Sequence, residues 1–83
     1  KSYYCYFNQL ISLKGAPKHI KGDFNCAFNN LDSLKYAPRI IDGIFSFESN
    51  FIETLHYCPE YVGAEIIYAD NPLPDEELDF LPD

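Results

Sequence analysis

Several common residues are scarce or missing from this chain, and their absence narrows what it can be. It has no Trp, no Met, only three Cys and only four Gly among 83 residues. No stretch approaches the roughly 20 apolar residues of a membrane-spanning helix, and no secretory leader is evident. An odd number of cysteines without a disulfide-framework spacing indicates a reducing compartment. We therefore expect a soluble protein of the cytoplasm that has no membrane partner.

The missing Met also bears on the N-terminus. We expect an initiator ahead of Lys1, and the sequence leaves open whether residues before Lys1 form an N-terminal cap. A chain of 83 residues corresponds to one small domain that buries roughly 60 to 65 % of its unfolded surface. Phe and Tyr, seven of each, help such a small core because each buried ring removes about 150 to 250 Å² from water.

The chain consists of copies of one 21-residue unit. Full copies span residues 3–23, 24–44 and 45–65, a partial copy spans 66–74, and an acidic C-terminal cap spans 75–83, all in one domain of residues 1–83. The copies align without insertions, and each has an asparagine at the same position: Asn8, Asn29, Asn50 and Asn71. Repeat arrays tend to need at least three units, and this chain provides three complete ones.

Apolar residues alternate ahead of each asparagine. The two inward columns contain Tyr3, Phe24, Phe45 and Ile66, and then Cys5, Cys26, Phe47 and Tyr68. This alternation predicts a short strand in each copy, over Tyr3 to Phe7 in the first. The asparagine amide that follows can bond to backbone groups of its own copy and of the neighbouring one. A later Pro favours an extended return path, and Gly22 and Gly43 permit a tight bend into the next strand.

Residues 24–38 show the consensus most clearly, as F-x-C-x-x-N-x-L-x-S-L-x-x-A-P. In this pattern the chain resembles the short leucine-rich repeats of bacterial effectors, and still more the variant common in bacteriophage and giant-virus proteins. The resemblance covers residues 3 to about 74. It implies a leucine-rich-repeat solenoid with short parallel β-strands on a concave face and irregular or extended return segments. The chain departs from the pattern by using Phe and Tyr for many inward leucines, and Ala64 for a glycine.

Such folds bind partners on the concave face, and here that face is graded from aromatic to acidic. We expect protein binding by residues of this face and its rim, namely Tyr4, Tyr6, Phe7, Asn25, Phe28, Ile44, Glu48, Glu65, Ile67 and Asp70. Exposed aromatic clusters are typical anchors of protein interfaces. The alternative is that Phe7 and Phe28 fold back over the rim and extend the core. If the viral resemblance holds, the target is a host or defence protein that this chain inhibits in the host-cell cytoplasm.

Charge is divided along the chain. Residues 1–41 carry a net charge of +4 and residues 42–83 a net charge of −11. The basic residues are Lys1, Lys14, Lys18, Lys21, Lys35 and Arg39. Two alternative functions follow from this division. One is a head-to-tail homo-oligomer, in which basic and acidic ends meet and the repeat protein assembles with itself. The other is an acidic decoy that imitates nucleic acid and inhibits a nuclease, as an anti-restriction or anti-CRISPR factor would, through Asp75, Glu76, Glu77 and Asp79.

The acidic C-terminal segment has the signature of a short helix. Pro74 suits a first helical position, and the carboxylates of Asp75, Glu76 and Glu77 favour the first turn. Leu78 and Leu81 can then face the last strand together. We expect a short helical cap, with a disordered acidic tail as the alternative.

The sequence contains no motif that is typical of catalysis or of cofactor binding. His19 and His56 stand at different positions of the repeat, and neither accompanies a nucleophile. Cys58 has too few partner ligands for zinc, and the C-terminal carboxylates lack the spacing of a calcium loop. The basic residues occupy return segments without stacking aromatics, which disfavours direct nucleic-acid binding. We expect a non-enzymatic protein without a metal or cofactor.

Overall fold

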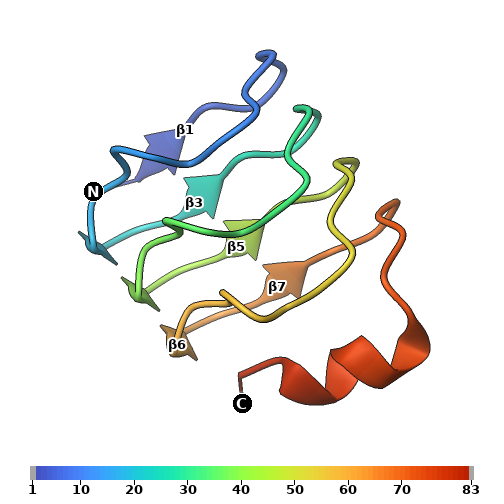
Figure 1. Ribbon diagram of the computed structural model, residues 1–83. Coiled ribbons are helices and arrows are strands. Elements are labelled where there is room, and N and C mark those ends of the chain that lie inside the picture. Colours follow the sequence, from blue (N-terminus) through green and yellow to red (C-terminus); the bar gives the residue numbers. More distant parts are fainter. Residues whose placement is uncertain (1, 83) are drawn as a thin grey trace.

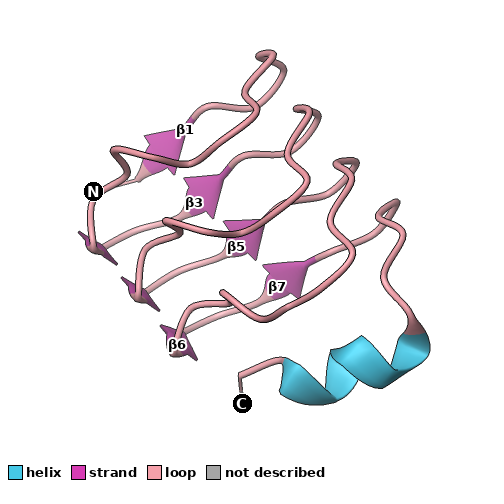
Figure 2. Cartoon of the chain, viewed as in Figure 1, coloured by secondary structure: helices cyan, strands magenta, loops and turns pink. Residues whose placement is uncertain are grey.

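The computed structural model describes residues 2–82, so the expected domain bounds at Lys1 and Asp83 lie outside the described residues. Each 21-residue copy forms one coil, and successive coils lie side by side in sequence order (Figure 1). Short parallel strands pair from coil to coil and build two sheets. Loops make up most of each coil, and helical structure follows only after the last strand (Figure 2).

The first sheet has four strands in the order β1, β3, β5 and β7. Their bounds are β1 Tyr3–Tyr4, β3 Phe24–Asn25, β5 Phe45–Ser46 and β7 Ile66–Ile67. The pairing keeps the period of the sequence, because Tyr3 lies opposite Phe24, Phe24 opposite Phe45, and Phe45 opposite Ile66. The parallel strands that the apolar alternation predicts are therefore present.

These strands are shorter than expected. The sequence predicts a strand from Tyr3 to Phe7, whereas β1 ends at Tyr4. Cys5 and Phe7 still donate their backbone N–H groups to the carbonyls of Asn25 and Ala27, at 2.9 and 3.1 Å. Strand geometry ends because Phe7 has a φ of 59°, which turns the chain out of the sheet.

The return segments, expected to be irregular or extended, also pair from coil to coil as a second sheet, which the sequence did not predict. Its strands are β2 His19–Ile20, β4 Ile40–Ile41 and β6 Tyr61–Val62, in the order β2, β4, β6. A proline stands two residues before each strand and restricts φ to extended values. Because the coils are equal in length, each extended stretch lies against the same stretch of the next coil and pairs with it. The N–H of Asp42, for example, donates to the carbonyl of Ile20 at 2.9 Å.

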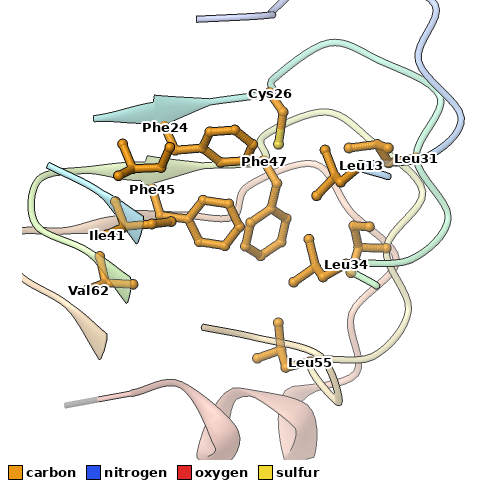
Figure 3. Close-up of a cluster of buried hydrophobic side chains, with 12 residues drawn as sticks. Leu13, Phe24, Cys26, Leu31, Leu34, Ile41, Phe45, Phe47, Leu55 and Val62 are labelled. Atoms are coloured by element: carbon orange, nitrogen blue, oxygen red, sulfur yellow. The ribbon is translucent and has the colours of Figure 1, made fainter. Parts of the chain in front are cut away.

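The core lies between the two sheets. Phe24 and Phe45 of the first sheet, Ile41 and Val62 of the second, and Phe47 belong to one buried cluster (Figure 3). All three rings are buried, and Phe45 packs on Phe24 with ring centroids 5.9 Å apart. Tyr3 belongs to the same inward column but is 42 % exposed, because a neighbouring coil covers it on one side only.

A ladder of asparagine side chains joins the coils where each leaves the first sheet. Asn50 is buried, and its Nδ2 donates to the carbonyls of Phe47 in its own coil and Cys26 in the preceding coil, both at 3.0 Å. Its Oδ1 accepts the N–H of Leu31, also at 3.0 Å. Asn29 and Asn71 repeat this arrangement one coil away. The expected bonding of the asparagines to two coils is confirmed at these three positions.

The acidic segment forms a 3₁₀-helix, η1, over Asp75–Phe80. Pro74 precedes the helix with an extended backbone, rather than occupying the expected first helical position. Leu78 is half-buried, and Leu81 packs against the core. Most of the expected C-terminal cap is thus an ordered helix in the described residues.

One carboxylate fastens η1 to the third coil. Glu77 Oε1 accepts hydrogen bonds from the hydroxyl of Thr54 at 3.0 Å and from the backbone N–H of Leu55 at 2.9 Å. This contact satisfies a backbone donor at the C-terminal end of the stacked coils.

Candidate protein-binding face

Four exposed aromatic residues gather at the first two coils. This aromatic cluster consists of Tyr4, Tyr6, Phe7 and Phe28, which are 60, 47, 70 and 42 % exposed. Tyr4 meets Tyr6 edge to face at 6.3 Å between centroids, and Tyr6 meets Phe7 in the same manner at 5.6 Å. Phe7 and Phe28 stack at 4.5 Å with only 4° between their planes. The structure therefore brings together the four aromatic residues that the sequence placed on the binding face and its rim.

The two phenylalanines do not extend the core, so the alternative that they fold over the rim is wrong. The physical reason is their backbone conformation. Both have φ near 58° in the left-handed region, as do Ser49 and Asp70 in the later coils. This turn places the next residue, the ladder asparagine, against the backbone of the preceding coil and leaves the rings outside.

Left-handed backbone is unfavourable for a bulky side chain. An L-residue is less stable by roughly 1 to 2 kcal/mol in this region than in the right-handed region. Glycine and asparagine tolerate the left-handed conformation best. Phe7 and Phe28 bear this strain while leaving much of their ring surface in water. The sequence gives no direct sign of this strain.

The carboxylate of Asp23 positions Tyr4 of the aromatic cluster. Asp23 precedes β3, and its Oδ2 accepts the hydroxyl of Tyr4 at 3.3 Å while its Oδ1 accepts the backbone N–H of Ile44 at 2.8 Å. Gly43 makes room for this carboxylate, because a β-carbon there would collide with Asp23 Oδ1. Close approach therefore accounts for this glycine, rather than the tight bend that the sequence suggested.

The remaining residues predicted for the binding face lie along the same sheet. Asn25, Ile44, Glu48 and Ile67 are half-buried, and Glu65 and Asp70 are exposed. Asn25 is occupied locally, since its Oδ1 accepts the N–H of Ala27 at 3.0 Å. Ser49 donates to Asp70 Oδ2 at 3.3 Å and links the third and fourth coils at the rim.

Alternation along the repeat also places Ala27 and Ser46 on this face, but neither is accessible. Ala27 and Ser46 are buried, with 4 and 3 % of their surface exposed. Their side chains are small and do not rise above the larger side chains that flank them. The accessible part of the face therefore has an aromatic region in the first two coils and a more acidic region in the later ones.

The return side also carries aromatic side chains that the sequence analysis missed. Tyr36 and Tyr57 are 49 and 45 % exposed, and Lys35 Nζ lies 5.4 Å from the centre of the Tyr36 ring. The premise that basic residues lack neighbouring aromatics is wrong at this turn, where adjacent side chains fold over one another. Arg39 pairs with Glu60, and His19 approaches Asp42 at 3.1 Å.

The carboxylates of the decoy alternative do not lie in equivalent surroundings. Asp75, Glu76 and Asp79 are exposed, whereas Glu77 is half-buried and bonded to Thr54 and Leu55. Glu77 therefore serves the attachment of η1.

The cysteines behave as core residues in the described structure. All three are free thiols, and burial raises the pKa of Cys5, of Cys26 and of Cys58, the last to about 11. The Sγ of Cys26 donates to the carbonyl of Ser46 at 3.4 Å. A raised pKa keeps the thiol protonated at neutral pH, which disfavours metal binding and nucleophilic chemistry. Within residues 2–82, no group of three or more His, Cys, Asp or Glu side chains converges as a metal site would require.

Comparisons of the chain with protein-family models, with curated proteins and with solved structures found no match. Over residues 2–82, no helix combines the length and apolar composition needed to cross a lipid bilayer.

Proposed function

We propose that this protein is a leucine-rich-repeat solenoid that binds another protein through the outer face of its first sheet and the adjoining rim. The aromatic cluster anchors the interaction, and the carboxylates of the later coils surround it. In the biological form of this proposal, the chain is a small phage or viral accessory protein. It binds and inhibits a host or defence protein in the host-cell cytoplasm, without catalysis.

One observation carries the proposal: two stacked phenylalanines are held in a strained backbone conformation and remain exposed. Asparagine or glycine at positions 7 and 28 would be compatible with the turn at lower conformational cost. The turn itself serves the asparagine ladder, but a phenylalanine at this position gains little burial to offset its strain, and strained residues cluster at functional sites. Aromatic side chains are also enriched among the residues that dominate binding energy at protein interfaces.

The alternatives have less support. For the decoy, the fastening of Glu77 to the third coil removes one of four carboxylates from the imitating surface. For head-to-tail assembly, η1 is attached at the acidic end, where the basic end of another copy would have to stack. Neither alternative explains the exposed aromatic cluster.

The test is capture of a binding protein from a lysate of the source's host, with variants chosen to preserve the fold. Phe7→Asn and Phe28→Asn together remove both rings, while asparagine tolerates the left-handed conformation. Tyr36→Asn is the matched control, because Tyr36 is also exposed aromatic and has a φ of 74°. We expect the wild-type chain and the Tyr36 variant to retain the same protein and the double variant to lose it.

Equal retention by the double variant would contradict binding through the cluster. If the retained protein is a nuclease that is released between about 50 and 200 mM salt, regardless of the aromatic variants, the decoy alternative is favoured instead. Circular dichroism of each variant checks that the loss reflects the surface and not unfolding.

A further inference from the structure

The basic residues of the described chain lie on the return side and are missing from the binding face. The segments that build the face and its rim are residues 2–8, 23–29, 44–50 and 65–71. They contain no Lys, Arg or His and have four carboxylates, Asp23, Glu48, Glu65 and Asp70. All the lysines and the arginine of the described residues lie on the return segments instead. A partner that approaches the face thus meets aromatic rings and negative charge together.

We propose that the segment recognised by this face is arginine-rich, with one guanidinium stacked on the aromatic cluster and further cations beside the carboxylates. This inference rests on the proposed function and names the chemistry of its partner. An exposed segment of a protein with several arginines and few acidic residues is the occupant that the surface fits.

The geometry of the cluster favours a flat cation. Phe7 and Phe28 stack with nearly parallel ring planes, and 70 % of Phe7 remains exposed, so its ring can receive a second planar group. Arginine has such a group, stacks on aromatic faces and is more weakly hydrated than the ammonium of lysine. Asp23 lies beside the cluster, because one of its carboxylate oxygens accepts the hydroxyl of Tyr4. A guanidinium over the rings would therefore have a carboxylate within the same region.

The later coils extend this complementarity. Glu65 and Asp70 are exposed and Glu48 is half-buried, and all three follow the cluster along the stacking direction of the coils. A surface of negative charge attracts cationic ligands and raises their association rate, with an effect that falls as salt rises. An uncharged apolar partner would gain nothing from these carboxylates and would have to desolvate them.

The experiment uses fluorescein-labelled peptides of 12 residues, four repeats of Arg-Gly-Ser, with Lys-Gly-Ser and Glu-Gly-Ser versions for comparison. Binding to the full chain is measured by fluorescence anisotropy at low salt. We expect saturable binding of the arginine peptide, binding of the lysine peptide about fivefold weaker, and no binding of the glutamate peptide. The double variant Phe7→Asn, Phe28→Asn should weaken binding of the arginine peptide about tenfold.

A matched charge control separates the face from the net charge of the molecule. Glu48→Gln with Asp70→Asn should weaken binding about tenfold at low salt, while Glu53→Gln with Asp32→Asn, the same change in charge on return segments, should change it less than twofold. Equal losses in the two double variants, or failure of the arginine peptide to bind, would overturn the inference.

The outcomes also separate this inference from the proposed function. If a protein is captured through Phe7 and Phe28 while the arginine peptide does not bind, the face binds proteins but its ligand is not cationic. If the arginine peptide binds and its affinity is unaffected by the aromatic variants, the cluster is not its site and the inference fails.

Discussion

At the scale of single residues, each ladder asparagine acts together with the residue that precedes it. Asn50 connects backbone groups of two coils, and Ser49 supplies the left-handed turn that places it there. The amide satisfies donors and acceptors that the turn removes from the sheet, where water cannot reach them. At each ladder position, several buried hydrogen bonds therefore offset the strain of the left-handed backbone.

We expect Asn50→Ala to destabilise the fold by about 1 to 3 kcal/mol, because it leaves the N–H of Leu31 buried without an acceptor. The carbonyls of Cys26 and Phe47 each lose one of two asparagine donors and keep the other, from Asn29 and Asn71. Asn8→Ala is the matched control. Asn8 is exposed and its Nδ2 bonds only to Cys5 and Tyr6 within its own coil, so its replacement should cost less than about 1 kcal/mol. Urea unfolding followed by circular dichroism measures both, and similar losses would contradict the ladder's role.

The strain at Phe7 leads to a second prediction, in which the usual order of alanine and glycine is reversed. In most positions glycine is less stable than alanine, because it has more conformational entropy to lose on folding. At a φ of 59° alanine retains the steric penalty and glycine does not. Phe7→Gly should therefore be more stable than Phe7→Ala by about 1 kcal/mol.

Chemical denaturation of the two variants measures this difference, and arginine-peptide binding should be weakened in both. Should the alanine variant equal or exceed the glycine variant in stability, the left-handed turn would not be strained, and the argument from strain to function would lose its basis.

At the scale of elements, η1 depends on tertiary contacts rather than on its own helical propensity. It has only six residues and no side-chain hydrogen bond at its N-cap, and isolated helices of that length are not stable in water. Leu81 and the carboxylate of Glu77 attach it to the coils. The helix in return supplies an acceptor for the N–H of Leu55 and for the hydroxyl of Thr54.

We expect Glu77→Ala to destabilise the C-terminal end by about 1 to 3 kcal/mol, because the N–H of Leu55 and the hydroxyl of Thr54 lose their acceptor. The exposed neighbour Glu76 is the control, and Glu76→Ala should have an effect below about 0.5 kcal/mol. Hydrogen exchange at Leu55, measured by NMR, reports the change locally. Unchanged exchange there in the Glu77 variant would mean that η1 is held by other contacts.

At the scale of the whole molecule, packing is tightest in the middle coils and weaker toward both ends. Phe24 and Phe45 are fully buried, whereas Tyr3 at one end and Ile66 at the other, in the same column, are partly exposed. In repeat proteins each unit contacts only its neighbours, so stability adds up from units and the interfaces between them. End units have one such interface and open more readily.

Hydrogen exchange over the whole chain should therefore show a gradient. We expect the N–H groups of Cys26 and Phe47, which donate to Ser46 and Ile67, to be the most protected. Those of Tyr3 and Phe7 in the first coil and of Leu81 after η1 should exchange first. Uniform protection from end to end would indicate a single cooperative unit and contradict this account.

The period, the parallel strands and the bonding of the asparagines to two coils can all be predicted from the amino-acid sequence. These features repeat at equal spacing, and equal spacing places equal residues side by side. The sequence also placed Tyr4, Tyr6, Phe7 and Phe28 together, because strand alternation and the repeat register are both local rules.

The return sheet, the attachment of η1 and the exposure of the phenylalanine rings could not be predicted, because they depend on contacts between coils. Pairing of the return strands requires neighbouring coils to meet in register, and the hydrogen bonds of Glu77 join residues 22 and 23 positions apart. The left-handed turn at Phe28 is set by the ladder asparagine that follows it, and Phe7 makes the same turn in the first coil. Both turns keep the rings outside the core. A bulky residue carries no sequence signal for that conformation, which it adopts because the hydrogen bonds between coils outweigh its strain.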